Sequence, residues 1–522
     1  MEFRNEATYL RMSKEKEEDF HKKYEQALNT VQSELGRHLP LYIGGEEVKG
    51  DREFVRTSPI DNRIVLAYLQ LGEKKHVDMA VEAAMKAFDE WKVTDYRKRS
   101  SIMVKAAKIM SREKFKLAAL MTLDNGKNRF EAVGDVDEAI DYLNYYSFEI
   151  IRNKGYSRSI KGVYPGEKVR GVMKPYGVWG VIPPFNFPLA ITVGMTVGAL
   201  VTGNTVVLKP ASDAPLMALE FYRIMHMAGL PEGVLNVLTG SGASVGQPII
   251  ENPFVMGIAF TGSFAVGSKG YTDFSRYGPK PFISEMGGKN AAIVTEKADL
   301  QKAVEGIVRG AFGFGGQKCS ATSRAIVFSS IKEEFLDRLV KRTSELKIGD
   351  PRNKEVFLGP VINEAAYMKY ERAVEDAKRN GRILIGGRRI TGDYMSYGYY
   401  VEPTIVDRLP KGHRVTVEEL FVPFLAVIEA QNLKEAVDIA NEVEYGLTAA
   451  IFSEDQKEIQ YFFDHIQAGV VYANRTVGAT TGAMVGVQPF VGWKHSGSTG
   501  KGAGSIFYLP QFMHEQAQSI YT

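Results

Sequence analysis

The stretch VWGVIPPFNFPLAITVGMTVGALVTGNTVVLKP, residues 178–210, decides the fold of this chain. It begins with the β-rich run VWGVI (178–182), continues through an apolar stretch of helical length (189–201) and ends with the β-rich run TVVLK (205–209). A strand, a helix and a strand in this order are typical of a parallel sheet with helical crossovers. The sequence therefore predicts the α/β class, with a doubly wound sheet.

A membrane span is an alternative interpretation of the same region, because residues 175–208 contain no charged side chain. Four prolines and five glycines interrupt the region, however, and divide it into strand, loop, helix and strand. Buried parallel strands have the same apolar composition as a span. We therefore interpret the region as the core of an α/β domain.

Two series of such elements follow each other along the chain. The first adds β-rich runs at 234–239, 257–261 and 282–285 and a helical stretch at 216–228. The second has β-rich runs at 325–330, 382–387, 424–430, 448–454 and 469–474, separated by helical stretches near 331–346, 364–379, 433–444 and 456–467. The two series predict two α/β domains.

Composition excludes several classes of protein. The 522 residues carry 65 Lys plus Arg against 62 Asp plus Glu, a net charge of +3, so no strong field of one sign favours nucleic acid or an anionic membrane. One cysteine excludes intrachain disulfides and a thiolate zinc cluster, and no metal site is predicted. The charged N-terminal residues do not resemble a secretory signal, so we expect a cytoplasmic protein.

Two segments outside these series also have a recognisable pattern. Residues 1–39 predict an N-terminal helical arm, whose apolar side chains at helical spacing are Phe20, Tyr24, Ala27, Leu28, Val31 and Leu35. Such an apolar stripe needs a partner surface. Residues 158–174 alternate polar and β-branched side chains without helix signals, which predicts a hairpin.

Chemistry is expected where the strands of the first series end, because ligands of open α/β sheets bind outside the carboxyl ends of the strands. The residues that follow these strands include Pro184, Phe185, Asn186, Phe187, Lys209, Gly240, Gly262, Ser263 and Glu285. Each of these signals is weak alone. Lys209 could bind a ribose or phosphate oxygen, or it could be an ordinary surface lysine. Glu285 could take part in the chemistry, or it could be an ordinary carboxylate at the turn after a strand. The chain contains neither a P-loop nor a full GxGxxG.

The single cysteine, Cys319, lies in GFGGQKCS (313–320), between a helical stretch and a β-rich run. A lone cysteine is either a small buried hydrophobe or a reactive thiol. Here the glycines expose backbone N–H groups, and we expect Lys318 to lower the cost of a thiolate. No histidine lies in a local motif that would identify a cysteine hydrolase.

Six motifs in order resemble those of the aldehyde dehydrogenase superfamily: PFNFP, VVLKP, FTGS, EMGGK, GQKC and EELFVP (418–423). The resemblance covers about residues 40 to 515. Within the superfamily, the opening FRNE and LPLYIGGEEV, the run CSATSR (319–324), the run TGAMVGVQPF (481–490) and the C-terminal region are similar to the 1-pyrroline-5-carboxylate dehydrogenases, also called glutamate semialdehyde dehydrogenases.

The resemblance implies a reaction and its residues. Cys319 would attack the aldehyde carbon as a thiolate. The Asn186 amide and the Cys319 backbone N–H would form the oxyanion hole, and Glu285 would activate the water that hydrolyses the thioester. Glutamate semialdehyde would be anchored by Ser320, Gly482 and Ala483 and walled by Phe187 and Phe490.

The resemblance also implies a dinucleotide site. Its residues would be Pro184, Phe185, Lys209, Ser212, Gly240, Gly262, Ser263, Glu419 and Phe421. The adenosine ribose would lie at Lys209, the pyrophosphate near Ser263 and the helix after Gly262, and the nicotinamide ribose at Glu419, with Phe421 packed beside it. NAD is the expected cofactor. Ser212 stands where many NAD-selective relatives have a glutamate that repels a 2′-phosphate, so NADP is an alternative. Val422 and Val491 replace glycines of the usual motifs, which puts the local backbone in question because valine disfavours a positive φ.

The implied organisation is an N-terminal arm (1–39), a dinucleotide-binding domain (40–154 and 175–286), a catalytic domain (287–504) and an oligomerisation arm (155–174 and 505–522). The arm would exchange strands between subunits of a homo-oligomer. Two other functions stay open at this point. One is an aldehyde dehydrogenase for another ω-semialdehyde or a sugar-derived aldehyde, and the other is a cofactor-binding scaffold or thiol hydrolase that transfers no hydride.

Overall fold

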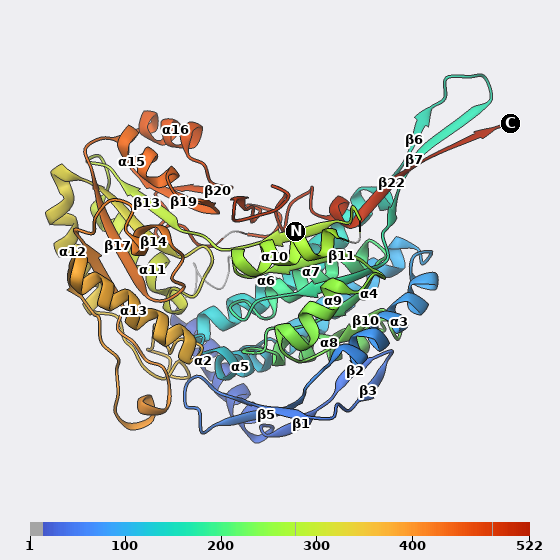
Figure 1. Cartoon of the computed structure of the whole chain (residues 1–522), viewed down its shortest axis with the longest axis horizontal. Helices are drawn as coiled ribbons and strands as arrows, with labels where there is room; N and C mark the ends of the chain where they lie inside the picture. The colour runs from blue at the N-terminus through green and yellow to red at the C-terminus, as the bar shows by residue number, and fades with distance from the viewer. Residues whose placement is uncertain (1–13, 277, 483) are drawn as a thin grey trace.

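The computed structural model of the protein describes residues 14–276, 278–482 and 484–522. Two lobes, each built on a seven-stranded sheet, lie side by side, and a narrow arm projects from one of them (Figure 1). No helix within the described ranges is long and apolar enough to cross a membrane. The fold class and the two α/β domains predicted from the sequence are confirmed.

The first lobe contains the sheet predicted from residues 178–210. Its strand order is β12-β11-β8-β9-β10-β2-β3. The strands are β8 (Val178–Ile182), β9 (Thr205–Leu208), β10 (Leu235–Val237), β11 (Val255–Thr261) and β12 (Phe282–Glu285), all parallel, with β2 (Leu41–Ile43) and β3 (Glu46–Val48) added antiparallel. Because β9 and β11 lie on opposite sides of β8, the chain reverses direction there, and such a switch point opens a crevice for ligands.

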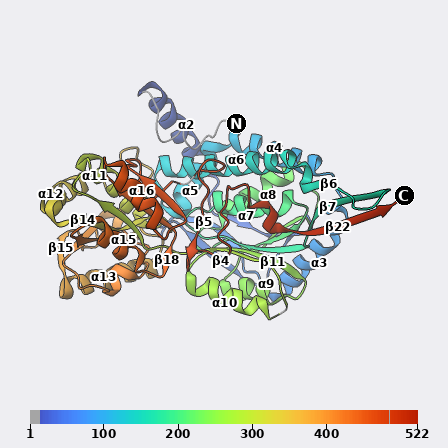
Figure 2. The same ribbon diagram turned by 90° about the horizontal axis from the view of Figure 1, so that it is seen from above.

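Helices cover both faces of this sheet (Figures 1 and 2). They are α3 (Lys74–Trp91), α4 (Tyr96–Arg112), α5 (Lys114–Asn125), α6 (Arg129–Arg152), α7 (Ala190–Val201), α8 (Leu216–Ala228), α9 (Gln247–Glu251) and α10 (Phe264–Ser275). Helix α7 is buried on nearly every side, which explains why residues 175–208 lack charge. At Gly198 an added Cβ would lie 2.8 Å from the Phe512 ring, so glycine permits this packing.

The second lobe has the strand order β15-β16-β17-β14-β13-β19-β20. Its strands are β13 (Asn290–Val294), β14 (Thr322–Phe328), β15 (Arg382–Ile385), β16 (Thr404–Asp407), β17 (Phe424–Ala430), β19 (Thr448–Phe452) and β20 (Val470–Ala473), all parallel except β15. Its helices are α11 (Leu300–Phe312), α12 (Lys332–Ser344), α13 (Glu364–Asn380), α14 (Arg414–Val417), α15 (Leu433–Asn441) and α16 (Gln456–His465). The sequence analysis identified five of these strands and missed β13 and β16.

The predicted N-terminal helix is α2 (Lys14–Ser33). Phe20, Tyr24 and Val31 are buried against the first lobe, and the Tyr24 hydroxyl donates a hydrogen bond to Thr122 Oγ1 on α5 at 2.5 Å. The apolar stripe therefore has the partner surface that it needs. The rest of the predicted arm before Lys14 lies outside the described residues.

The predicted hairpin forms the projecting arm. Strands β6 (Ser157–Lys161) and β7 (Glu167–Pro175) are antiparallel, and the C-terminal strand β22 (Met513–Tyr521) pairs with β7 along its whole length. Two small sheets complete the fold: β1 (Arg37–Leu39), β5 (Val65–Gln70) and β4 (Glu53–Thr57) form one, and β18 (Tyr445–Gly446) and β21 (Trp493–Lys494) form the other.

Candidate active site

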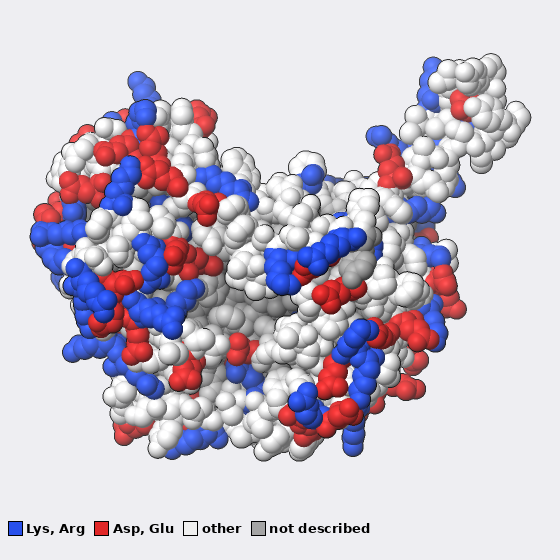
Figure 3. Space-filling model, in the orientation of Figure 1, with Lys and Arg blue, Asp and Glu red and all other residues white. Residues whose placement is uncertain are grey.

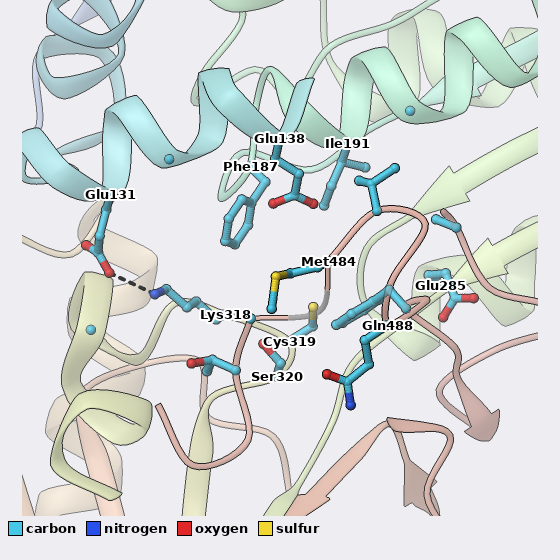
Figure 4. A pocket seen from close by; sticks show the side chains of 18 of the residues that line it. Glu131, Glu138, Phe187, Ile191, Glu285, Lys318, Cys319, Ser320, Met484 and Gln488 are labelled. Atoms are coloured by element: carbon cyan, nitrogen blue, oxygen red, sulfur yellow. Dashed lines mark hydrogen bonds and ion pairs between the residues drawn. The ribbon is translucent and has the colours of Figure 1, made fainter. Parts of the chain in front are cut away.

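A cavity of about 500 Å³ lies between the two lobes. The surface is also hollowed between the lobes on the face shown in Figure 3. Residues from both lobes line the cavity. They include six of the predicted site residues: Phe187, Glu285, Cys319, Ser320, Gly482 and Phe490. The structure thus brings the predicted nucleophile, the predicted base and most of the predicted substrate wall to one place (Figure 4).

The backbone around Cys319 is held tightly from two sides. An added Cβ at Gly288 would lie 2.4 Å from the Cys319 carbonyl oxygen, so only glycine fits there. The side-chain amide of Asn290 donates to the same oxygen at 2.7 Å and to the Ala321 carbonyl at 2.9 Å. Gly316, with φ of +66°, makes the preceding turn against the backbone of Val422. These contacts fix the position of the thiol.

The electrostatic environment of Cys319 differs from the sequence prediction. Burial raises the pKa of the Cys319 thiol well above its ordinary value, and the nearby Glu419 and Glu285 carboxylates raise it further. Backbone N–H groups of Ser320 and Cys319 itself act in the opposite direction. The expectation that Lys318 favours the thiolate is wrong for this structure, because its ammonium pairs with Glu131 Oε1 at 2.7 Å.

Glu285 ends strand β12 at the edge of the cavity. Burial raises the pKa of this carboxyl well above its ordinary value, and an N–H group of Gly492 offsets part of the shift. Its Oε2 atom is buried without a hydrogen-bond partner among the described residues. A carboxylate with a raised pKa and an open lone pair is a competent proton acceptor.

Asn186 follows strand β8 and is 2% exposed. Its neighbours on the loop are held in place: the Asn125 amide donates to the Phe185 carbonyl at 3.3 Å, and Phe187 lines the cavity. The side chain of Asn186 is not among the residues that line the cavity as it stands. Its role in an oxyanion hole stays a prediction.

Lys209, which the resemblance assigns to the adenosine ribose, lies at the end of β9, and Ser212 and Gly240 lie on the loops that follow β9 and β10. Lys209 is 5% exposed, and its ammonium donates to the Pro210 carbonyl at 2.7 Å. Burial lowers the pKa of Lys209 to about 8. The Ser212 hydroxyl donates to the Gly240 carbonyl at 2.9 Å, which ties the two predicted loops together. A buried cation without a carboxylate in direct contact suits an oxygen-rich ligand.

Ser263 and Gly262 lie where β11 leads into α10. The Ser263 hydroxyl accepts from the Val266 N–H at 3.4 Å and caps the helix. An added Cβ at Gly262 would lie 2.6 Å from the Phe260 ring. The free N–H groups at the start of a helix attract a phosphate, as the prediction of a pyrophosphate site requires.

Glu419 approaches the first lobe from the second. Its Oε1 accepts from the Gly288 N–H at 2.9 Å, and an added Cβ at Gly287 would collide with its carboxylate. Phe421 contacts Phe185 edge to face, with ring centroids 5.8 Å apart. Phe421 thus lies close to the loop after β8 in the first lobe, and the role of Glu419 at a ribose of the cofactor stays a prediction.

The concern about Val422 and Val491 is resolved by the backbone. Neither valine adopts a positive φ. The neighbouring Phe421 has a positive φ of +60° instead. Both valines occupy ordinary backbone conformations.

The predicted substrate wall is well ordered by packing. The Lys127 ammonium lies 3.8 Å from the centre of the Phe187 ring and pairs with Asp135 Oδ2 at 2.6 Å. The Thr480 hydroxyl donates to the Ser320 carbonyl at 2.6 Å, and Gly482 has φ of +95°. Ala483, the other half of the predicted anchor, lies outside the described residues.

Helix α6 contributes two carboxylates to the cavity that the sequence analysis did not identify. Glu131 carries the ion pair with Lys318, and Glu138 points from the helix into the cavity (Figure 4). Burial, followed by the Asp135 carboxylate, raises the pKa of Glu138 to about 8. Glu131, Asp135, Glu138 and Tyr142 follow the i, i+4, i+7, i+11 spacing of one helix face, a signal that was present in the sequence.

In the part of the chain that the structure describes, no group of three or more His, Cys, Asp or Glu is placed to hold a metal ion. The candidate site contains a thiol and several carboxylates, and loops whose groups suit a dinucleotide lie near it.

Comparison with known proteins agrees with this geometry. Residues 47–516 match the aldehyde dehydrogenase family. A 1-pyrroline-5-carboxylate dehydrogenase from Geobacillus sp. (strain WCH70) is 40% identical over 505 residues, 96% of each chain. A crystal structure of 1-pyrroline-5-carboxylate dehydrogenase from Thermus with bound NAD has a TM-score of 0.94 and 38% identity, and the match covers 100% of this chain and 99% of that one. This chain belongs to the aldehyde dehydrogenase family.

Proposed function

We propose that the protein oxidises L-glutamate 5-semialdehyde, the open form of 1-pyrroline-5-carboxylate, to L-glutamate in proline catabolism. The observation that carries the proposal is one cavity lined by the Cys319 thiol, the Glu285 carboxylate and the polar groups of Ser320 and Gly482. The relatives named for this activity match almost the whole chain. The reaction needs a nucleophile, a base and a polar anchor for the amino-acid end, and the cavity offers all three.

The charges of the cavity suit an amino-acid aldehyde. Glu138 has no Lys or Arg within ion-pair distance among the described residues, so the α-ammonium of the substrate can pair with it. Ser320, Gly482 and Ala483 would take the α-carboxylate. Phe187 and Phe490 would cover the aliphatic chain, since both lie beside the polar groups.

The residues present fit NAD. Lys209 supplies a buried cation, α10 supplies free N–H groups at its first turn, and Glu419 supplies an acceptor for ribose hydroxyls. When bound, NAD supplies the hydride acceptor. Ser212 places no negative charge beside Lys209, so we propose that NADP is also accepted.

The first chemical step forms a bond between Cys319 Sγ and the aldehyde carbon. The thiol must lose its proton, and Glu285, whose pKa is also raised, is the carboxylate of the cavity that can receive it. The carbonyl oxygen becomes an alkoxide. Backbone N–H at Cys319 and the Asn186 amide would stabilise that charge.

The second step releases the product. Once hydride has left the carbon, the substrate is a thioester on Cys319. Glu285 first releases the Cys319 proton to solvent and then takes a proton from water, the hydroxide attacks the thioester carbon, and Cys319 leaves as thiolate with glutamate as product. The unpartnered Oε2 of Glu285 is free to accept that proton.

We also propose the organisation that goes with this function. Residues 40–154 and 175–286 bind the dinucleotide, residues 287–504 carry the nucleophile, and residues 155–174 and 505–522 join subunits in a homo-oligomer. A single cysteine that must stay reduced favours the cytoplasm.

The test compares NADH formation with 1-pyrroline-5-carboxylate, glutarate semialdehyde and propanal, with Cys319→Ala as the inactive control. A clear preference in kcat/KM for the pyrroline, lost in the variant, would support the proposal. Equal or higher kcat/KM for another aldehyde would contradict the substrate and leave the dehydrogenase chemistry standing. Ester hydrolysis without aldehyde-dependent NADH formation would contradict both.

A further inference from the structure

Three cationic side chains around the cavity have an ion-pair partner, and a fourth does not. Lys127 pairs with Asp135, Lys318 pairs with Glu131, and Arg309 pairs with Glu305. Arg475 also lines the cavity, yet no Asp or Glu of the described ranges forms an ion pair with it. Arg475 is half-buried, so its guanidinium is open to an anionic ligand that enters the cavity.

The position of Arg475 is fixed by the chain before it. Asn474, in a left-handed conformation with φ of +55°, is clamped to the end of β19: its side-chain oxygen accepts from the Ser453 N–H at 3.0 Å, and its amide donates to the Ser453 carbonyl at 2.8 Å. This turn ends strand β20, and the Arg475 side chain packs back over that strand. The guanidinium lies 5.0 Å from the centre of the Tyr472 ring.

Arg475 also touches the predicted anchor. Its Nη2 donates to the Gly482 carbonyl at 3.1 Å, and an added Cβ at Gly482 would lie 2.5 Å from the same nitrogen. The Nε atom is buried with no acceptor within the described part of the chain. The bond to a neutral carbonyl leaves the charge of Arg475 uncompensated.

We infer that Arg475 selects aldehydes that carry a carboxylate at the far end from the reacting carbon. It holds the Gly482 carbonyl, and its charge is compensated by the substrate carboxylate. Glu138 then offers a carboxyl group to the ammonium of an amino acid, and Arg475 offers a guanidinium to its carboxylate. The inference rests on the proposed function and adds the residue that decides substrate class.

The test uses the ratio of kcat/KM for 1-pyrroline-5-carboxylate to kcat/KM for butanal. Arg475→Met keeps the apolar stem and removes the charge. We expect the ratio to fall about 10- to 100-fold, through KM, because a charged hydrogen bond is lost. The inhibition constant of L-glutamate is expected to rise by a similar factor. Arg475→Lys keeps the charge without the fork and is expected to recover part of the ratio.

The matched control is Arg309→Met, which removes another cation from the same cavity and leaves Glu305 paired with Arg342 at 2.8 Å. We expect this variant to keep the wild-type ratio. An equal fall in both variants would mean that the total charge of the cavity decides, and would overturn the role of Arg475. An equal loss for both substrates in Arg475→Met and Arg475→Lys would mean a structural role and also overturn it.

The two proposals fail in different ways. A wild-type protein that does not prefer the pyrroline to butanal contradicts the proposed function before any variant is made. A wild-type preference that survives in Arg475→Met contradicts only the inference. If Arg475→Met does not fold, Arg475→Lys decides, because an unchanged glutamate inhibition constant in that variant would exclude a role for the guanidinium fork.

Discussion

The surroundings of Cys319 disfavour the thiolate form of its side chain in the protein without ligands. Burial and two nearby carboxylates raise the pKa of the thiol above its ordinary value. The thiol is therefore protonated at neutral pH in the protein without ligands, and it is protected from oxidation and alkylation. Its reactivity must come from a proton acceptor in the cavity, and Glu285 is placed to provide one.

Alkylation of the free protein tests this protonation state. Cys319 is the only cysteine of the chain, so the rate of reaction with iodoacetamide reports it alone. Because the pKa is raised, we expect the rate to keep rising above pH 9, without a plateau near neutrality. Mass spectrometry of Cys319→Ala gives the background. An alkylation rate that reaches a plateau between pH 6 and 8 would mean that Cys319 is already a thiolate there, and would contradict the raised pKa.

Substitution of Glu285 tests its role in both chemical steps. In Glu285→Gln the proposed acceptor of the Cys319 proton and the base for thioester hydrolysis are both absent, and a buried unpartnered carboxylate oxygen is lost. We therefore expect the first NADH of each active site to form more slowly than in wild type, and steady turnover to be slowed about 100- to 10,000-fold. Stopped-flow absorbance measures both phases. A burst of NADH at the wild-type rate, followed by slow turnover, would restrict Glu285 to thioester hydrolysis and contradict its role in the attack by Cys319.

Among individual residues, the sequence analysis predicted those that lie in motifs and missed those that lie outside them. Cys319 and Glu285 meet in one cavity as expected. Glu138 and Arg475 lie in no motif, and their importance depends on which neighbours lack an opposite charge. That information exists only once α6 and the loop after β20 face the same cavity.

At the scale of elements, α6 is unusual because it buries carboxylates. Glu138 has a pKa raised to about 8, whereas in the unfolded chain it titrates near 4.5. Between these values the folded protein binds more protons than the unfolded chain. The free energy of unfolding therefore falls as the pH rises through this window.

Glu138→Gln removes this titration. We compare the free energy of unfolding of the variant with that of wild type. We expect this difference to be about 1 to 3 kcal/mol more in favour of the variant at pH 8.5 than at pH 5, because the amide carries no charge to bury. Thermal unfolding at both pH values measures the difference in Tm. Glu131→Gln is an unsuitable control because Glu131 pairs with Lys318, so the exposed Glu18 on α2 is mutated to Gln instead. Equal Tm differences at both pH values would contradict the raised pKa.

Elements with strong periodicity or β-branched runs were predictable, and the others were not. Strand β8 has the predicted bounds, and α7 and α8 agree within one residue. Strand β13 was missed because NAAIV is rich in alanine, which has little strand preference. The sequence analysis assigned no element to the helices from α3 to α6. In α6 the buried face carries charged groups that find their partners only in the folded protein, whereas the buried face of α3 is apolar apart from His76 and was open to prediction.

At the scale of the whole molecule, the arm is the feature that the folding of the two lobes does not explain. Its three strands project beyond the body of the protein, and its tip carries few charges on the face shown in Figure 3. Val163 is 85% exposed, Tyr164 is 64% exposed and Tyr521 is 65% exposed. The sequence predicted the hairpin, but the pairing of β22 with β7 joins segments more than 300 residues apart in sequence and follows from the tertiary fold.

Large apolar side chains on a projecting sheet with free edges are typical of a surface that another chain covers. We therefore expect light scattering of the wild-type protein to give a multiple of the chain mass of 58.0 kDa. The double variant Val163→Glu with Tyr521→Glu places charges on this surface and is expected to dissociate the assembly while the Tm of the lobes stays within a few degrees. Val93→Glu is the control, since Val93 is 76% exposed in the loop after α3, outside the arm. A wild-type mass equal to that of one chain would contradict a role of the arm's exposed side chains in assembly. Equal dissociation of the Val93→Glu control would contradict it as well.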